Sequence, residues 1–485
     1  MNKIQESRAV ILITIDALRP DHLRLYGYQK NSAPNLEEFA KKGTTFLNAI
    51  TNGPESPTAF SALFTSTLPF LDGGYSPLPV EKITLPQILK ENGISSFAIH
   101  SNPNLGRFFN YDRGFDLFLD GERYKTKRNH NRSTNLRQIF SLYIRTILNY
   151  KDFFNKLMYR IKGFNKFKAW LRRIPFITDM LLPFTPIAYN APYVTNQCIS
   201  ILSKKEKPFF MWAHYMDVHN PYNPPTSNIL KFREKDFSLS RKEMLNQKIF
   251  YNPQKYKITP DILDDLRLLY DGEINYVDDY LGRLLEFFRA KFKKNCLIII
   301  TADHGESFFE HGSFGHQGSV FEELLHVPLF IIELGKEHSL KIVDEFVQLL
   351  DIGPTILNYF EIPIPDSYQG KSLLPLNREN FFVRNNPIFS ECYQKEGIMM
   401  RNKAEGYIML SIRKGNWKYI FDEERNMEFL FNLKIDPIEQ NNLINSIQSK
   451  ANEFRKLKSD HIKKIIISDE KSKIIKGIEG LDLKI

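Results

Sequence analysis

Short runs of apolar residues alternate along the chain with longer stretches in which apolar side chains recur every three or four positions. The run Val10–Ile15 is continuous and rich in β-branched residues, which is typical of a strand buried on both faces of a parallel sheet. Four further runs have the same character: Phe97–His100, Pro208–Tyr215, Cys296–Asp303 and Val327–Glu333. Helical periodicity marks the segments between them, for example Ala33–Gly43 and Glu273–Phe292. This alternation predicts an α/β fold with a large, mostly parallel sheet between layers of helices.

The pattern changes after about Asn380. Short β-like runs with turns follow, at Ile408–Ile420 and Met427–Leu433, and a final helix is predicted to begin near Ser446. We therefore expect a large α/β domain over residues 1–385 and a small C-terminal α+β subdomain over residues 386–485.

Composition and cysteine usage are those of a globular protein from a reducing compartment. The 485 residues are 42% hydrophobic and 25% charged, which excludes general disorder and collagen-like repeats. The longest apolar runs are far shorter than the ~18 residues that span a bilayer, and the first ten residues lack the apolar core of a secretory signal. Three scattered cysteines form neither a disulfide framework nor a metal-binding cluster. These features predict a cytoplasmic protein.

Positive charge is concentrated in a predicted helical insertion at residues 121–195. Between Gly121 and Pro175 there are 15 Lys or Arg residues against two acidic ones, with aromatic residues at roughly helical spacing. Three interpretations stay open: an ordinary solvated insertion packed on the body, an interfacial helix on an anionic membrane surface, and a surface for a polyanionic substrate. Nucleic acid is the least favoured partner, because no recognisable binding motif accompanies the charge.

Candidate metal ligands directly follow the predicted strands. Asp16 comes after the first strand, Asp303 and His304 after Cys296–Ala302, and His214 or His219 at the end of the strand that begins near Pro208. One aspartate at a strand end is more often a helix cap, but chemistry in open α/β sheets lies beyond the carboxyl ends of the strands. Two carboxylates and an imidazole predict one divalent ion, with Mn²⁺ or Zn²⁺ favoured and Ca²⁺ or Mg²⁺ left open.

The same segments resemble the sulfatase family of the alkaline phosphatase superfamily, and the similar blocks cover most of the chain outside the basic insertion. The nucleophile region is APNLEEFAKKGTTFLNAITNGPESPTAFSALFTSTLP, residues 33–69. The other similar blocks are ITIDALRPDHLRLYGY (13–28), YDGEINYVDDYLGRLL (270–285), TADHGESFFEHGSFGHQGSVFEELLHVPLFI (301–331), DIGPTIL with QGKSLLPL (351–357, 369–376), and IRKGNWKYI with FLFNLKIDPIEQNNL (412–443).

This resemblance implies an alkaline-phosphatase-like fold and a nucleophile at Ser56. Usual sulfatases convert a Cys or Ser to formylglycine within a C/S-x-P-S-R signature, whereas here Thr58 replaces the proline and Phe60 the arginine. We therefore expect Ser56 to act unmodified, with Thr58 as the alternative hydroxyl. Usual sulfatases have two consecutive aspartates after the first strand, and at these two positions this chain has Asp16 and Ala17.

The remaining metal set resembles that of relatives that act at phosphorus. It consists of Asp16, Ser56, Asp303 and His304, and it is similar to the single-metal sites of phosphonate monoester hydrolases and lipoteichoic acid synthases. The resemblance also implies catalytic roles for His219 and His316, and substrate-binding roles for His311, His100 and Asn102.

Together these features predict a metal-dependent hydrolase that cleaves sulfate or phosphate esters through a covalent intermediate on Ser56. The family points to sulfate esters, and the nucleophile and metal set favour phosphate esters. The expected substrate is a sulfated or phosphorylated small molecule, glycan or lipid. The alternative is a transferase that passes a phospho-group to a glycan or lipid acceptor at the membrane surface, where the basic insertion would bind and hold the protein peripherally.

Overall fold

An eight-stranded sheet forms the centre of the protein, which we describe from a computed structural model that covers residues 8–120 and 190–482 except 207, 251, 317, 337 and 377–385. All described residues belong to one unit of the chain. The strand order is β10-β2-β9-β6-β1-β5-β3-β4. The strands are β1 (Ala9–Ile15), β2 (Thr44–Ile50), β3 (Ser95–Ile99), β4 (Leu117–Leu119), β5 (Phe209–Tyr215), β6 (Cys296–Ala302), β9 (His326–Leu334) and β10 (Lys341–Gln348).

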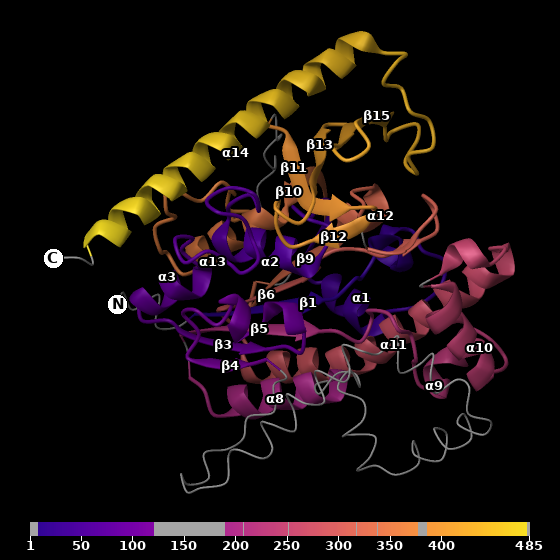
Figure 1. Cartoon of the computed structure of the whole chain (residues 1–485). Coiled ribbons are helices and arrows are strands. Elements are labelled where there is room, and N and C mark those ends of the chain that lie inside the picture. The colour runs from indigo at the N-terminus through magenta and orange to yellow at the C-terminus, as the bar shows by residue number, and fades with distance from the viewer. Residues whose placement is uncertain are drawn as a thin grey trace, which may run out of the picture. The chain divides into compact units, whose positions relative to one another are not determined.

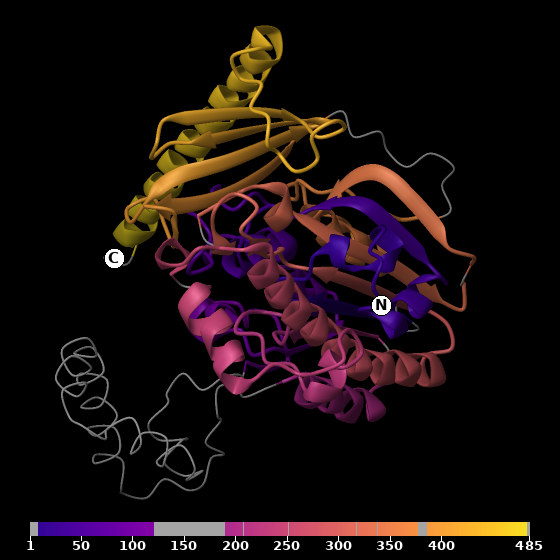
Figure 2. The same cartoon turned by 90° about the vertical axis from the view of Figure 1, so that its right-hand side faces the viewer.

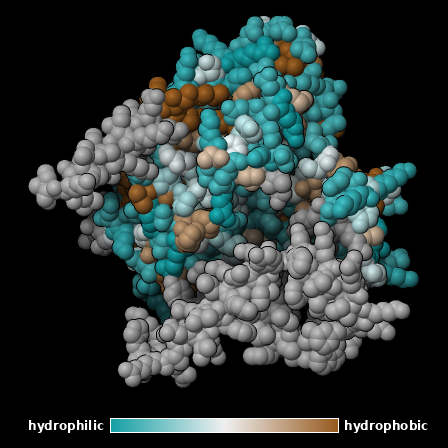
Figure 3. Space-filling view, viewed as in Figure 1, coloured by the Kyte–Doolittle hydropathy of each residue, from teal (hydrophilic) through white to brown (hydrophobic). Residues whose placement is uncertain are grey.

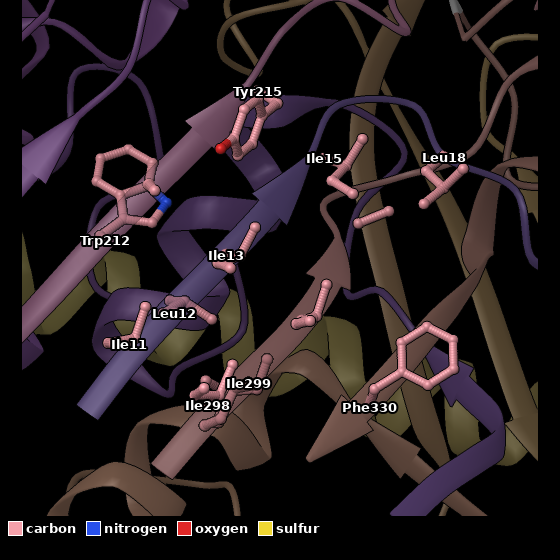
Figure 4. Packing of buried hydrophobic residues seen from close by; sticks show 14 of the residues in the cluster. Ile11, Leu12, Ile13, Ile15, Leu18, Trp212, Tyr215, Ile298, Ile299 and Phe330 are labelled. Atoms are coloured by element: carbon pink, nitrogen blue, oxygen red, sulfur yellow. The ribbon is translucent and has the colours of Figure 1, made fainter. Parts of the chain in front are cut away.

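The sheet is mixed but mostly parallel, as the sequence predicts. Strand β9 is antiparallel to β2 and β6, and the other pairings in this sheet are parallel. Every residue of β1, β5 and β6 is buried. Figure 4 shows side chains of β1 packed between those of the neighbouring strands, with Trp212 on β5 and Ile298 and Ile299 on β6. Burial on both faces explains why these strands read as continuous apolar runs.

Helices cover both faces of the sheet (Figure 1). One face carries α1 (Pro34–Ala40), α8 (Ala191–Ser203) and the 32-residue α11 (Pro260–Lys291). The other face carries α2 (Ser56–Thr65), α3 (Leu85–Glu91) and α13 (Ile352–Tyr359). The predicted arrangement of a sheet between helical layers is therefore confirmed, and α11 begins 13 residues before the helical segment expected from Glu273.

A second, antiparallel sheet follows in the C-terminal part (Figure 2). Its order is β12-β11-β13-β14-β15, and α14 (Gln448–Asp482) packs against it. On α14, His461 contacts Glu391 of β11, and the other oxygen of Glu391 accepts a hydrogen bond from the backbone N–H of Phe70. These buried contacts tie α14 to the loop that follows α2. The strands are β11 (Ile388–Lys395), β12 (Ile398–Met400), β13 (Tyr407–Lys414), β14 (Trp417–Asp422) and β15 (Met427–Asn432).

Short elements complete the described part of the chain. They include the two-stranded pair β7 (Ser307–Phe308) and β8 (Phe314–Gly315), the helices α9 (Thr226–Ile229), α10 (Leu239–Glu243) and α12 (Glu322–Leu325), and several short 3-10 and π helices. On the face seen in Figure 3, the described surface is mostly hydrophilic. None of the helices in the described ranges combines the length and apolar character needed to cross a membrane.

Two predicted boundaries fall on residues that the structure does not describe. Most of the predicted basic insertion, residues 121–189, lies outside the described residues, and α8 begins at Ala191, within the range predicted for the insertion. The predicted domain boundary at residue 385 lies in the undescribed segment 377–385.

A buried carboxylate on α11 should stabilise the fold by capping α1. The N-cap residue of α1, Ala33, has no capping side chain, and Asp278 accepts hydrogen bonds from the backbone N–H groups of Asn35 (2.9 Å) and Leu36 (2.8 Å). We expect Asp278→Ala to lower the free energy of unfolding by about 2 kcal/mol, because two buried donors lose their acceptor. Urea unfolding of the wild type and the variant measures this difference in free energy. The exposed α11 variant Glu286→Ala should change stability by less than about 0.5 kcal/mol, and an equal effect of both variants would contradict the assignment.

Candidate active site

Two buried carboxylates lie side by side at the carboxyl ends of adjacent parallel strands. Ile15, the last residue of β1, pairs with Ala302, the last residue of β6, so the residues that follow, Asp16 and Asp303, emerge at the same level. Both are completely buried. The chain turns sharply after Asp16, because Ala17 has a positive φ of 57°, and this turn lets the Ala17 N–H donate to Asp303 Oδ1 (3.3 Å).

A serine hydroxyl faces one of these carboxylates. Ser56 is the first residue of α2, and the preceding residue, Glu55, caps the helix. Ser56 Oγ donates to Asp16 Oδ2 (3.4 Å) and accepts a hydrogen bond from Asn102 Nδ2 (2.8 Å). Asn102 also donates to Asp16 Oδ2 (3.2 Å). Strands β1, β2 and β3 thus deliver three of the predicted site residues to one edge of the sheet.

The two residues that depart from the formylglycine signature have local structural partners. The Thr58 hydroxyl donates to the backbone carbonyl of Glu55 (2.9 Å), which places it in the helix cap. Phe60 is buried, with its ring centroid 4.9 Å from that of Trp212 and 5.2 Å from that of His214. Ser56 is therefore the hydroxyl that faces the carboxylates, and Thr58 is held in the cap.

Three neighbouring buried atoms around Asp16 have no hydrogen-bond partner among the described residues: Asp16 Oδ1, Asp303 Oδ2 and His304 Nε2. His304 Nε2 lies 3.7 Å from Asp16 Oδ1 and 3.6 Å from Asp303 Oδ2. His304 Nδ1 must carry the ring hydrogen, because it donates to the carbonyl of Gly305 (2.8 Å), so Nε2 presents its lone pair. Ligands bound ~2.0–2.4 Å from one ion lie roughly 3–4 Å apart, so these atoms fit a shared divalent cation.

A fourth residue, His214, lies in the same cluster. Asp16, His214 and Asp303 each offer a ligand atom, and these atoms lie within 4.8 Å of one another. His214 is one of the candidates predicted from its place at a strand end, but the metal set implied by the family resemblance leaves it out. Its Nε2 faces Asp16 Oδ2 at 3.2 Å, on the side of the carboxylate opposite the unpartnered Oδ1.

Two further imidazoles border this cluster. The ring centroids of His219 and His316 are 5.0 Å apart, and His316 lies 4.3 Å from the ring of His304. His219 Nδ1 donates to the carbonyl of Asn220, which leaves its Nε2 for other partners. Both imidazoles predicted to be catalytic therefore lie next to the predicted metal ligands.

Comparisons with known proteins identify the family. Residues 8–362 match the sulfatase family model, and residues 309–466 match a model described as the C-terminal region of N-sulphoglucosamine sulphohydrolase. The chain belongs to the sulfatase family. As the sequence motifs indicate, it is thus an ester hydrolase of the alkaline phosphatase superfamily.

Individual relatives agree with this assignment. This sulfatase is 25% identical to an arylsulfatase of Clostridium perfringens, over 98% of each chain, and 25% identical to arylsulfatase K of Rattus norvegicus, over 91% of this chain and 75% of the relative. Its fold is similar to that of BT4656, which was solved with its substrate D-glucosamine-2-N,6-O-disulfate (TM-score 0.67, 17% identity, 96% and 99% of the two chains). It is also similar to the phosphonate monoester hydrolase of Agrobacterium radiobacter (TM-score 0.64, 19% identity, 96% of both chains).

The electrostatics of the sulfatase site keep its ligands in the protonation states that metal binding requires. Burial alone would raise the pKa of Asp16, but the hydrogen bond from His214 and the nearby imidazoles hold that pKa well below its usual range. Burial lowers the pKa of His304, which keeps its ring neutral. An ionised carboxylate and a neutral imidazole are the forms that bind a cation.

His316 is held as a cation by a buried carboxylate that the sequence analysis did not identify. Its Nδ1 donates to Glu306 Oε1 (3.2 Å), and Tyr222 donates to Glu306 Oε2 (2.9 Å). Burial would lower the pKa of His316, but its hydrogen bond and charge interaction with Glu306 raise that pKa to about 9. His316 therefore presents a positive charge near Asp16 and Glu55 at neutral pH.

Two of the predicted substrate-binding histidines have other surroundings. His100 is fully buried, and its ring stacks on Trp212 (5.0 Å). His311 stacks on Phe321 (3.6 Å), and its Nδ1 lies 2.8 Å from Glu323 Oε1. The His100 ring lies near His214 and the backbone of Asn102, whereas His311 contacts Glu323 and Phe321; of the three, Asn102 is the residue whose side chain reaches Ser56. A substrate-binding role for these two histidines stays a prediction without support from their contacts.

Replacing the partner of His316 should move the pH dependence of catalysis. The imidazolium exists below the pKa of about 9, so the rate should fall as pH rises through that value. In Glu306→Gln, His316 loses its negative partner but stays buried, so its pKa should drop. We therefore expect the rate to fall at a pH about one to two units lower than in the wild type. Profiles of kcat/KM against pH with an aryl ester measure this. Tyr222→Phe, which keeps the carboxylate, should shift the profile less, and an unchanged alkaline limb in Glu306→Gln would contradict the assignment.

Proposed function

We propose that this sulfatase-family protein hydrolyses anionic esters with Ser56 as an unmodified nucleophile. The observation that carries the proposal is the position of Ser56 Oγ, which contacts both Asn102 Nδ2 and Asp16 Oδ2 beside three unpartnered ligand atoms. Ser56 also opens helix α2, and the N–H groups at the start of a helix favour a bound anion.

The surroundings of Ser56 favour its remaining a serine. The formylglycine signature requires a proline and an arginine at positions where this chain has Thr58 and Phe60. In the folded protein Thr58 is part of the helix cap and Phe60 is packed on Trp212, so both residues contribute to local structure. We infer that the residues around Ser56 serve packing and capping and that the hydroxyl itself reacts.

The residues of the site have complementary roles in this reaction. Asp16, Asp303 and His304 would hold the divalent cation, which supplies positive charge that stabilises the transition state. Ser56, the fourth ligand expected from the resemblance, faces Asp16 Oδ2, and we assign it as the nucleophile. Asn102 orients Ser56 Oγ, and the hydroxyl proton leaves along its hydrogen bond toward Asp16 Oδ2. The imidazolium of His316 pairs with an anionic oxygen of the substrate.

The chemistry proceeds in two displacements. In the first, Ser56 Oγ forms a bond to sulfur or phosphorus, the ester bond to the leaving oxygen breaks, and His219 donates a proton to that oxygen. In the second, a water molecule attacks the same centre, His219 takes up the proton of the water, and the Ser56 hydroxyl is restored. The proton of Ser56 passes to Asp16 in the first displacement and returns to Oγ in the second, and the proton that His219 gives to the leaving alcohol is replaced from water.

We favour phosphate esters over sulfate esters as substrates. Ala17 leaves the site one carboxylate short of the paired aspartates of usual sulfatases, and the serine is unmodified in our proposal. The imidazole of His304 among the ligands favours Mn²⁺ or Zn²⁺ over Ca²⁺ or Mg²⁺. A sulfated sugar is the substrate of the structural relative BT4656, so a sulfated or phosphorylated glycan or small molecule is the substrate class that we propose.

Turnover of three aryl esters tests both the nucleophile and the substrate preference. With Mn²⁺ or Zn²⁺, we expect an aryl phosphate ester, mono or diester, to react faster than the aryl sulfate. Ser56→Ala should lower kcat by about 10³-fold or more, because the attacking atom is removed. Ser61→Ala is a matched control on the same helix, with a buried hydroxyl far along α2, and should leave kcat unchanged. Faster sulfate turnover would overturn the preference, and full activity of Ser56→Ala would remove Ser56 as nucleophile.

The mass of the protein tests the chemical state of Ser56 directly. We expect the intact protein, and the peptide that contains Ser56, to have the mass of unmodified serine. Conversion to formylglycine removes two hydrogens, so a mass lower by that amount in the wild type, and not in Ser56→Ala, would contradict the proposal.

A further inference from the structure

A buried chain of polar side chains runs under the candidate active site, and the register of the sheet creates it. Thr14 on β1 pairs directly with His214 on β5. Side chains two residues apart lie on the same face of a strand. Trp212 and His214 on β5, and Thr14 and Asp16 at the end of β1, therefore lie on the face covered by α2. All four side chains are completely buried.

The hydrogen bonds along this chain have a defined direction. Trp212 Nε1 donates to Thr14 Oγ1 (2.9 Å), Thr14 Oγ1 lies 2.9 Å from His214 Nδ1, and His214 Nε2 lies 3.2 Å from Asp16 Oδ2. An indole N–H can only donate, and an ionised carboxylate can only accept. Every group is satisfied when Thr14 donates its hydroxyl hydrogen to Nδ1 and Nε2–H donates to Asp16. The reverse tautomer would set two lone pairs, on Nε2 and Oδ2, against each other.

Aromatic packing holds the ring of His214 in this orientation. Phe60 meets His214 edge-on, with centroids 5.2 Å apart and an interplanar angle of 89°, and it also packs on Trp212. Figure 4 shows the indole nitrogen of Trp212 turned toward β1. A rotated imidazole would lose both its Thr14 contact and its Asp16 contact in a buried environment, which is costly.

His214 and His304 therefore differ in what they offer a cation. His304 donates from Nδ1 to a carbonyl, which leaves the Nε2 lone pair free, whereas His214 uses Nε2–H as a donor. Three donors converge on Asp16 Oδ2, namely Ser56, Asn102 and His214, and leave Asp16 Oδ1 unpartnered.

We propose that His214 is a positioning residue, held by Thr14 and Trp212, that orients the carboxylate of Asp16 and does not itself bind the cation. Its hydrogen bond fixes the plane of the carboxylate so that Oδ1 faces Asp303 and His304 while Oδ2 faces Ser56. This inference rests on the proposed function only in taking Asp16 as a ligand. Partners of this kind change metal affinity by about 10–100-fold when they are removed.

Two variants of Thr14 separate this role from simple packing. Thr14→Val keeps the shape of the side chain and removes the hydroxyl, and Thr14→Ser keeps the hydroxyl. Titration of metal-stripped protein with Mn²⁺ by calorimetry should show about tenfold weaker binding for Thr14→Val, and binding within about threefold of the wild type for Thr14→Ser. Equal affinity of Thr14→Val and wild type, or equal losses in both variants, would overturn the proposal. If Thr14→Val does not fold, Trp212→Phe takes its place, because it removes the first donor in this series of hydrogen bonds.

The tautomer of His214 provides an independent readout. In ¹⁵N-histidine-labelled protein titrated with Zn²⁺, the His214 signals, assigned by their loss in His214→Gln, should show a hydrogen on Nε2 both with and without the metal. Loss of that hydrogen on addition of Zn²⁺ would identify His214 as a ligand and overturn the proposal. Neither measurement uses turnover, so the two proposals can fail separately. If the protein does not hydrolyse the esters but its metal affinity still depends on Thr14, this inference stands.

Discussion

Two carboxylates, Asp16 and Asp303, are buried next to each other at adjacent strand ends, and the site around them offsets this charge. Unpaired ionised groups are strongly disfavoured in a protein interior, so such a pair needs hydrogen-bond donors, and a bound cation would offset its remaining charge. Donors come from three directions: from backbone N–H groups at Asp303, from Asn102 and Ser56, and from His214. The unpartnered oxygens then face the lone pair of His304, which defines a place for a metal ion. The proposed nucleophile, the candidate metal ligands and the surrounding donors thus follow from one electrostatic constraint.

The parallel sheet makes this concentration of charge possible. Strands β1, β2, β3, β5 and β6 run in the same direction, so the residues after them meet at one edge although they are far apart in sequence. The faces of the central strands are buried under helices, and this excludes water from the groups beneath the site. Histidines with different tasks result from different hydrogen-bond partners. In our proposal, a carbonyl at Nδ1 frees Nε2 of His304 for a cation, the carboxylate of Glu306 keeps His316 charged, and Thr14 leaves His214 as a donor.

Much of this arrangement could be predicted from the sequence, and the remainder depends on contacts between strands. The α/β fold follows from continuous apolar runs, and Asp16 and Asp303-His304 follow from their places after such runs. The resemblance to sulfatases added Ser56, His219, His316 and Asn102, which the structure places near one another. The sequence did not reveal that His214 faces Asp16 or that Glu306 holds His316, because both depend on register and side-chain direction. His311 packs against Phe321, and His100 packs on Trp212 in the polar chain beneath the site, so neither ring has a contact that supports the predicted substrate-binding role.

The most direct measurement of this account is anomalous diffraction from a crystal of the protein loaded with Mn²⁺. We predict a single peak at this edge of the sheet, about 2.0–2.3 Å from Asp16 Oδ1, Asp303 Oδ2 and His304 Nε2, with His214 Nε2 beyond bonding distance. A peak bonded to His214 would contradict the assignment of the ligands. Saturating Mn²⁺ with no peak near Asp16 and Asp303 would contradict the central claim that these buried carboxylates share a cation.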